Sequence, residues 1–175
     1  MGMNYTYEVI ARKESADRLV RAICEHLVPD DKARLLSALD LGAADIHRNI
    51  FREDWEQPFN HIFLSFAFAE DEILVEYEKG ESDNGAKLQE ASQGRMVQID
   101  SVWTDITVGD DYVRVRATAA TSRMSGLFSA SSSINKAFCD IAESGGALLV
   151  IFDYEELYYA AVWPKDDFEI PKYPE

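Results

Sequence analysis

Histidine and cysteine are the residue types in this chain that most often bind metals or act as nucleophiles. The three histidines, His26, His47 and His61, are too far apart in sequence for two of them to share one helix face. Cys24 and Cys139 form no C-x-x-C pair, and the sequence contains neither a G-x-S-x-G motif nor a glycine-rich phosphate loop. We therefore expect no metal, no cofactor and no catalytic residue.

Carboxylates are the reactive groups that remain, and they gather at expected turns. Acidic residues cluster at all three expected hairpin turns, residues 70–72, 110–111 and 153–156. Turns favour Asp, and charged tips also protect sheet edges, so this placement has an ordinary structural explanation. If two tips meet at one edge of the sheet, they form a negative rim that attracts a basic surface. The partner-binding residues that we predict are Glu70, Asp71, Glu72, Asp153, Tyr154, Glu155, Glu156 and Tyr158.

The net charge discriminates between kinds of partner. The chain has 17 basic and 32 acidic residues among 175, which gives a formal net charge of −15. Such a charge opposes binding to nucleic acid phosphates or to an anionic membrane. We predict a non-enzymatic binding protein of the cytoplasm that engages a basic protein partner, in the manner of an inhibitor or an immunity protein.

Cysteine usage and hydropathy also favour a cytoplasmic protein. Both cysteines fall within expected helices beside apolar neighbours, as is typical of reduced thiols. No stretch of about 18 apolar residues would span a membrane, and the N-terminus lacks the basic and apolar regions of a signal peptide. A homodimer, formed through an exposed edge strand or through the aromatic face of Tyr5 and Tyr7, is a further alternative.

A serine-rich segment, residues 121–133 (TSRMSGLFSASSS), departs from the acidic pattern. Long connections of this kind are often functional. We consider three interpretations: a lid over a small-molecule site, a hydrophobic contact for a partner, and a short helix that caps the core. The first supports an alternative function, a small-molecule-binding domain or enzyme with its site between sheet and helices beneath this segment. Its polar contacts would be His61, Tyr112, Arg114 and Arg116.

Hydrophobic periodicity predicts the elements that position these residues. Apolar residues recur at helical spacing after Ser15, after Asp30 and from Ile134, which predicts three helices. A change of apolar face near Ser101 predicts a β-bulge. Apolar and polar alternation, or a short apolar run, predicts strands over residues 5–10, 62–68, 73–78, 97–108, 112–119, 147–152 and 157–163.

These elements predict one α+β domain over residues 1–175, with a mainly antiparallel sheet of six to seven strands and helices on one face. The order strand, helix, hairpin recurs, which suggests two βαββ (ferredoxin-like) halves, residues 4–79 and 96–163, joined by the polar linker 80–95. Chance similarity between amphipathic helices and acidic turns explains the recurrence equally well. Residues 43–60 fit either a short helix or an ordered loop.

Overall fold

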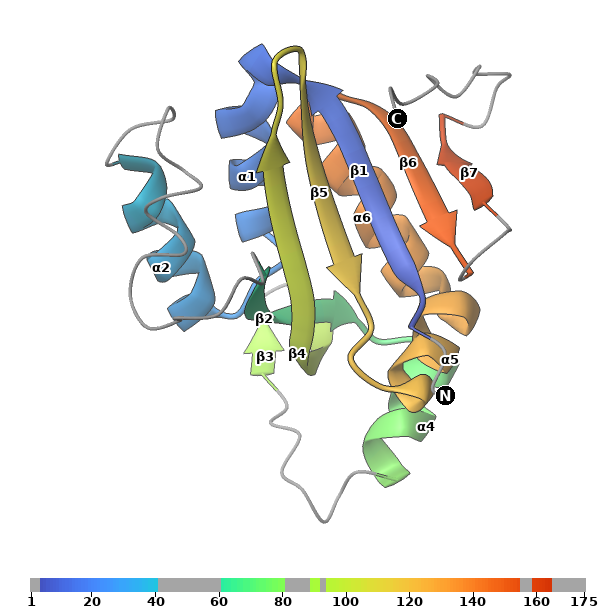
Figure 1. The fold of residues 1–175 in the computed structure, drawn as a ribbon. Coiled ribbons are helices and arrows are strands. Elements are labelled where there is room, and N and C mark those ends of the chain that lie inside the picture. The colour runs from blue at the N-terminus through green and yellow to red at the C-terminus, as the bar shows by residue number, and fades with distance from the viewer. Residues whose placement is uncertain (1–3, 41–60, 81–88, 92–93, 155–158, 165–175) are drawn as a thin grey trace.

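An antiparallel sheet of seven strands forms the centre of the computed structural model, which describes residues 4–40, 61–80, 89–91, 94–154 and 159–164. Neighbouring strands are hydrogen-bonded in the order β2-β4-β5-β1-β6-β7, and β3 pairs with β4 beside this path. Each described pairing is antiparallel, which confirms the expected α+β class and strand number. The strands, shown in Figure 1, are β1 (Thr6–Arg12), β2 (His61–Ala69), β3 (Gln89–Ala91), β4 (Gly94–Val108), β5 (Tyr112–Thr118), β6 (Ala147–Asp153) and β7 (Tyr159–Trp163).

Helices cover one face of this sheet, as the sequence predicts. Figure 1 shows α1 and α6 behind the strands, α2 beyond α1, and α4 and α5 near the lower end of the sheet. A short 3-10 helix, η1 (Lys13–Ser15), precedes α1. The α-helices are α1 (Ala16–Cys24), α2 (Pro29–Asp40), α4 (Glu72–Gly80), α5 (Ser122–Ala130) and α6 (Ser132–Gly145).

Aromatic side chains fill the layer between the sheet and α6. The ring of Tyr7 stacks on Phe138 of α6 with centroids 4.2 Å apart, and it contacts the ring of Phe152 of β6 at 4.6 Å. All three side chains are at most 3% exposed. Full burial of one such ring contributes about 2–3 kcal/mol to folding. The lower end of the sheet is therefore held firmly against α6.

The segment that follows β2 is a helix, so the predicted strand over residues 73–78 is wrong. These residues belong to α4, whose buried side chain is Leu74. Asp71 precedes the helix, and its Oδ1 accepts a hydrogen bond from the Leu74 amide at 2.9 Å. This contact favours a helix because it satisfies an amide that the first turn leaves without a partner. The first proposed half thus ends in α4 and the second in β7, while the internal repeat itself stays a prediction.

The serine-rich segment folds as α5 and the start of α6, which confirms the third interpretation, a short helix against the core. The hydroxyl of Thr121 accepts a hydrogen bond from the Met124 amide at 3.2 Å and begins α5. The hydroxyl of Ser131 accepts one from the Ile134 amide at 3.1 Å and begins α6. Met124 and Phe128 are buried, so the apolar residues of this segment belong to the core.

The β-bulge expected near Ser101 is present. Ser101 has a φ of 60°, and the register of β2 against β4 shifts between Leu64 and Phe66. One extra residue at this point lets apolar side chains on both sides of it reach the core. Ile99 and Val102 are accordingly both buried.

Two other expectations concern segments that the structure describes only in part. Residues 43–60 lie outside the described residues. The described part of the linker 80–95 contains β3, which pairs with the first residues of β4. Part of this linker is therefore a strand of the sheet.

The chain that links α1 to α2 covers the outer edge of β2. The His26 carbonyl accepts a hydrogen bond from the Ala67 amide at 2.8 Å. Two residues along, the Val28 amide donates to the Ser65 carbonyl at 3.0 Å. These contacts occupy backbone groups that an edge strand would otherwise expose.

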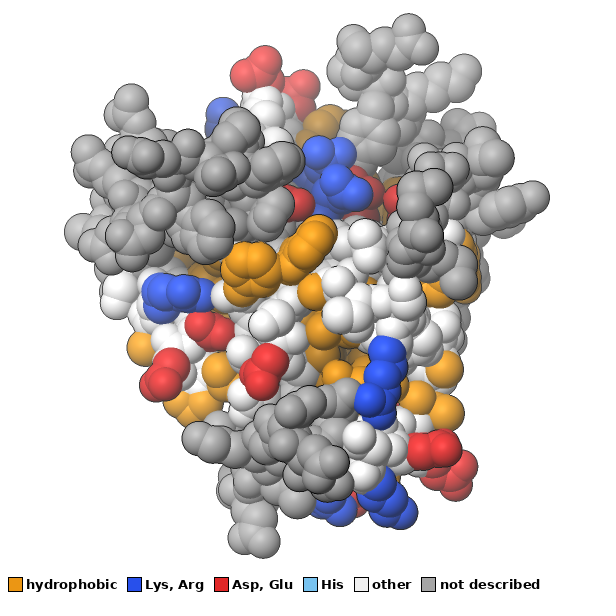
Figure 2. Space-filling view, turned by 60° about the horizontal axis from the view of Figure 1, so that its bottom comes forward, with side chains coloured by type: hydrophobic (Ala, Val, Ile, Leu, Met, Phe, Trp, Pro, Cys, Tyr) orange, Lys and Arg blue, Asp and Glu red, His pale blue; other side chains and the backbone are white. Residues whose placement is uncertain are grey.

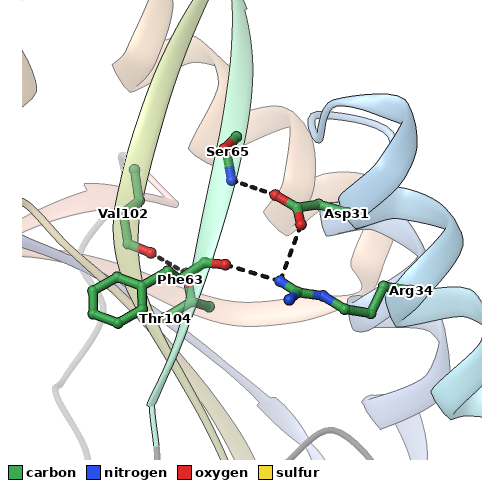
Figure 3. A network of polar contacts seen from close by, with 6 residues as sticks. All are labelled: Asp31, Arg34, Phe63, Ser65, Val102 and Thr104. Atoms are coloured by element: carbon green, nitrogen blue, oxygen red, sulfur yellow. Dashed lines mark hydrogen bonds and ion pairs between the residues drawn. The ribbon is translucent and has the colours of Figure 1, made fainter.

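Side chains of α2 continue this cover, as Figure 3 shows. Asp31 Oδ2 accepts a hydrogen bond from the Ser65 amide at 2.7 Å. Arg34 Nη2 donates to the Phe63 carbonyl at 2.9 Å and pairs with Asp31 Oδ1 at 3.0 Å. The edge of β2 is thus closed by backbone and side-chain groups together.

Candidate functional site

A groove lies at the lower end of the sheet, between the junction of α5 with α6 and the strands β6 and β7. Its volume is about 480 Å³. Ligand sites commonly measure roughly 300–1,000 Å³ and combine an apolar lining with a few polar groups. This groove, which we call the α5–α6 groove, is lined by Tyr7, residues 128–132, Asn135, Phe152, Tyr154 and residues 160–162. Aromatic rings and serine hydroxyls therefore meet in one hollow.

Tyr7 brings a buried hydroxyl to the groove. It donates a hydrogen bond to the Phe128 carbonyl at 3.1 Å and accepts one from Asn135 Nδ2 at 3.4 Å. Burial raises the pKa of Tyr7 to about 12, although the hydrogen bond from Asn135 opposes the rise. The side chain is therefore neutral at physiological pH, and it links β1 to both helices of the junction.

Asp71, predicted to bind a partner, makes several contacts within the chain. Its Oδ2 accepts hydrogen bonds from the Ser131 hydroxyl at 2.7 Å and from the Ser133 amide at 3.0 Å. Partial burial raises the pKa of Asp71, but these bonds and the one from Leu74 outweigh it and hold the pKa below 3.8. Asp71 therefore positions Ser131, a lining residue of the groove, and ties α4 to α6.

The two neighbours of Asp71 in the first acidic turn are exposed. Glu70 Oε2 lies 3.6 Å from Arg95 Nε, and Arg95 also pairs with Glu78. An exposed pair of this kind contributes about 0–1 kcal/mol. Glu72 exposes its carboxylate in the first turn of α4. The negative charge that this turn presents to solvent comes mainly from Glu72.

Tyr154, which follows β6, lines the groove from the strand side. Because β2 and β6 run in the same direction, residues 70–72 and Asp153 emerge at the same end of the sheet. Asp153 is half-buried, whereas Tyr154 is 40% exposed and packs edge-to-face against Tyr5 at 5.4 Å between centroids. Three further predicted partner-binding residues lie outside the described residues: Glu155, Glu156 and Tyr158.

The described carboxylates do not merge into a single patch. The turn at residues 110–111 joins β4 to β5 at the opposite end of the sheet. Figure 2 brings the lower end forward and shows hydrophobic side chains near the middle, with acidic and basic side chains scattered separately about them. The described acidic groups at this end therefore form no continuous negative surface.

The four residues predicted for a small-molecule site do not line the α5–α6 groove, although residues 128–132 of the serine-rich segment do. Arg114 and Arg116 alternate with buried residues of β5 and lie on the face of the sheet away from the helices. The strand register places Arg116 beside Asp105, and Asp105 beside His61, in one row across three strands. The structure thus brings Arg114 and Arg116 to the face of the sheet away from the helices, and the backbone register places His61 in the same row as Arg116.

The surroundings of these residues differ from those of the α5–α6 groove. Arg114 Nη1 lies 3.3 Å from Glu8 Oε1, and Glu8 is 8% exposed. The carboxylate of Glu8 is largely removed from water, whereas the Arg114 side chain is 37% exposed, so the arginine chiefly compensates a buried carboxylate. Tyr112, the fourth predicted residue, lines a separate hollow of about 520 Å³ with Arg12, Lys13, Glu14, Asp110 and Asp111. Because that lining is almost entirely charged, the α5–α6 groove is the better candidate for a binding site.

The sequence analysis does not predict the groove as a whole. Its lining comes from β1, α5, α6, β6, β7, the residue between α5 and α6 and the residue after β6, and among these residues only Tyr154 is predicted to bind a partner. Tyr7 is expected on a dimer face, yet it is 2% exposed in the core. One sequence feature could have indicated the junction of α5 with α6 beside the groove: Ser131 precedes an apolar helix, a position that is typical of an N-cap.

The chemistry of the site is limited by what the described residues contain. In those parts of the chain, no three His, Cys, Asp or Glu side chains are grouped to hold a metal ion. Within the same ranges, no helix is both long enough and apolar enough to cross a membrane. Comparisons with protein-family models, with curated proteins and with solved structures give no match.

Proposed function

We propose that this chain is a non-enzymatic binding protein that holds a segment of a basic protein partner in the α5–α6 groove, as an inhibitor or immunity protein would. The observation that carries the proposal is the exposed ring of Tyr154 beside a hollow lined by other aromatic rings. Tyrosines are frequent anchors of protein interfaces, because they bury a large area at a low cost in side-chain entropy.

Charge supports a basic partner. At a net charge of −15, the chain attracts cationic surfaces at separations up to about 8 Å at physiological salt. Glu72 and Asp153 place carboxylates at the same end of the sheet as the groove. Such charges mainly raise the association rate, whereas burial of Tyr154 in the complex would mainly lower the dissociation rate.

A random peptide library displayed on phage and selected on the full chain tests the proposal. We expect the selected peptides to be rich in Lys and Arg and to lose binding to the variant Ser129→Trp, whose indole would fill the groove. Ser122→Trp is the matched control, because Ser122 is exposed on the same helix outside the groove lining. Selection of peptides without basic residues, or equal binding to both variants, would contradict the proposal.

A small-molecule site in the same groove is the second candidate, and one observation favours it. The Tyr7 hydroxyl and the Asn135 amide form a polar pair among aromatic rings, which is an arrangement that orients small ligands. Ligand-observed NMR with a fragment library tests this function. Fragments that bind the wild type and Ser122→Trp but not Ser129→Trp, together with a failed peptide selection, would favour it over a protein partner.

A further inference from the structure

The two edges of the sheet differ in how their backbone groups are occupied. At β2, the segment before α2 and the side chains of Asp31 and Arg34 satisfy outward amides and carbonyls of residues 63–67. At the other edge, β7 pairs with β6 on one side, and no described residue pairs with its other side. In an antiparallel edge strand, alternate residues direct both backbone groups outward.

The sequence of β7 does not protect this edge. Natural edge strands are commonly guarded by a charged residue, a proline or a bulge that turns them away. Residues 159–161 of β7 (YAA) contain neither charge nor proline, and the bulge in the pairing with β6 lies at Val162, so it protects only the end of the strand. Ala160 and Ala161 have the smallest side chains that a strand commonly carries there, so another backbone can approach closely.

The α5–α6 groove continues along β7. Residues 160–162 line it together with Phe152 and Tyr154. Ala160 pairs with Phe152, whose side chain faces α6, so Ala160 lies on the groove side of the sheet. Ala161 lies on the other side, because successive residues of a strand alternate between faces. A strand added to β7 would therefore place every second side chain on the groove side.

The chain also indicates the charge of such a strand. Asp153 pairs with the first residue of β7 and lies on the face away from the helices. The chain as a whole has a net charge of −15. Side chains on the same face as Asp153 would therefore meet negative charge, which basic residues complement.

We infer that a partner segment of alternating apolar and basic residues adds as an extra strand to the outer edge of β7, with its apolar side chains in the α5–α6 groove. The basic character of this segment rests on the proposed function, whereas the strand pairing rests on the unguarded edge. This mode of recognition is known as β-augmentation: backbone hydrogen bonds supply affinity, and alternate side chains supply specificity.

The test uses the full chain labelled with nitrogen-15 and the peptide acetyl-KVKVKVKV-amide. Two analogues of equal charge carry N-methyl groups, one on every lysine and the other on every valine. With valines in the groove the register is fixed, so only one of the two sets of amides faces β7. We expect one analogue to bind at least tenfold more weakly than the other, and the β7 amides to gain protection from exchange with the stronger binder.

Equal binding of both analogues, with chemical shift changes at the groove, would overturn strand addition while leaving a basic partner in place. Binding of acetyl-TVTVTVTV-amide as tightly as the basic peptide, with protected β7 amides, would support strand addition and contradict the basic partner. Absence of binding by every peptide would overturn the inference. So would dimerisation of the chain alone through β7, detected by light scattering together with protection of the same amides, because a second copy would then be the occupant.

Discussion

The carboxylate of Asp71 accepts a hydrogen bond of 2.7 Å from the hydroxyl of Ser131, which lies 60 residues further along the chain. The same carboxylate also accepts hydrogen bonds from the Leu74 and Ser133 amides, at 2.9 Å and 3.0 Å. One side chain thus satisfies the first turns of both α4 and α6. It also fixes Ser131 at the rim of the α5–α6 groove.

Replacement of Asp71 by Ala should lower the free energy of unfolding by about 2–3 kcal/mol, because both helices lose a capping partner and Ser131 loses its acceptor. Urea denaturation followed by circular dichroism measures the change. Glu72→Ala is the control: this neighbouring carboxylate is exposed, and we expect a change within about 0.5 kcal/mol. Similar losses in the two variants would show that Asp71 has no special structural role.

Acid should abolish the contribution of the Asp71 charge. The folded-state pKa lies below 3.8, so the unfolded chain binds the proton more readily. The stabilisation is therefore fully present above the unfolded-state pKa and is lost as pH falls through the folded-state value. Asp71→Asn cannot ionise, so the stability difference between wild type and variant should shrink as pH falls from about 6 to about 3. Urea midpoints across this range measure it, and a constant difference would contradict the prediction.

His26 should make the chain less stable in mild acid. Burial lowers its pKa below 6.5 in the folded state, and the nearby carboxylates of Asp140 and Glu25 offset this only in part. The unfolded chain therefore takes up the proton first, and stability falls as pH drops below about 6.5. We expect the melting temperature to decrease less between pH 7.5 and pH 5.5 in His26→Gln than in the wild type, by thermal unfolding. If the melting temperatures of the two proteins decrease equally between pH 7.5 and pH 5.5, this effect of His26 is excluded.

Two helical glycines should respond in opposite ways to alanine. A Cβ atom at Gly145 of α6 would lie 2.8 Å from Leu19 Cδ1 and 3.1 Å from Leu19 Cα of α1, so Gly145→Ala should destabilise by about 1–3 kcal/mol. A Cβ atom at Gly126 of α5 would meet no atom within 4 Å, so Gly126→Ala should stabilise by about 1 kcal/mol through helix propensity. Chemical denaturation measures both. A loss of stability in both variants would mean that α5 needs its glycine for another reason.

Periodicity predicts the elements that bury one face and fails where distant residues decide the structure. The alternation in β5 and the helical spacing in α6 match the observed burial, because each element packs against the core along a single side. Residues 73–78 have the period-two pattern of a strand, since the large apolar residues Ile73, Val75 and Tyr77 occupy every second position. Their helical state is favoured by the cap at Asp71, and Asp71 is in turn held by residues of α6.

The candidate site is less predictable than the fold for the same reason. Tyr154 is a predicted binding residue and lines the groove. It could be predicted because its position beside an acidic turn can be read from the local sequence. The rest of the lining is brought together from separate elements by strand order, and no single stretch of sequence encodes that order. The sequence also places Arg114 and Arg116 in a site between sheet and helices, whereas the phase of β5 turns both toward the other face.

The cover that Asp31 and Arg34 place over β2 also limits how many molecules can join through their sheets. Growth of a fibre by strand pairing requires two unpaired edge strands on every molecule, because each added molecule must leave one edge strand available for the next. In the path from β2 to β7, residues 63–67 of β2 are covered, and a pairing at β7 would occupy the strand at the other end. Self-association through β7 alone would therefore join two subunits.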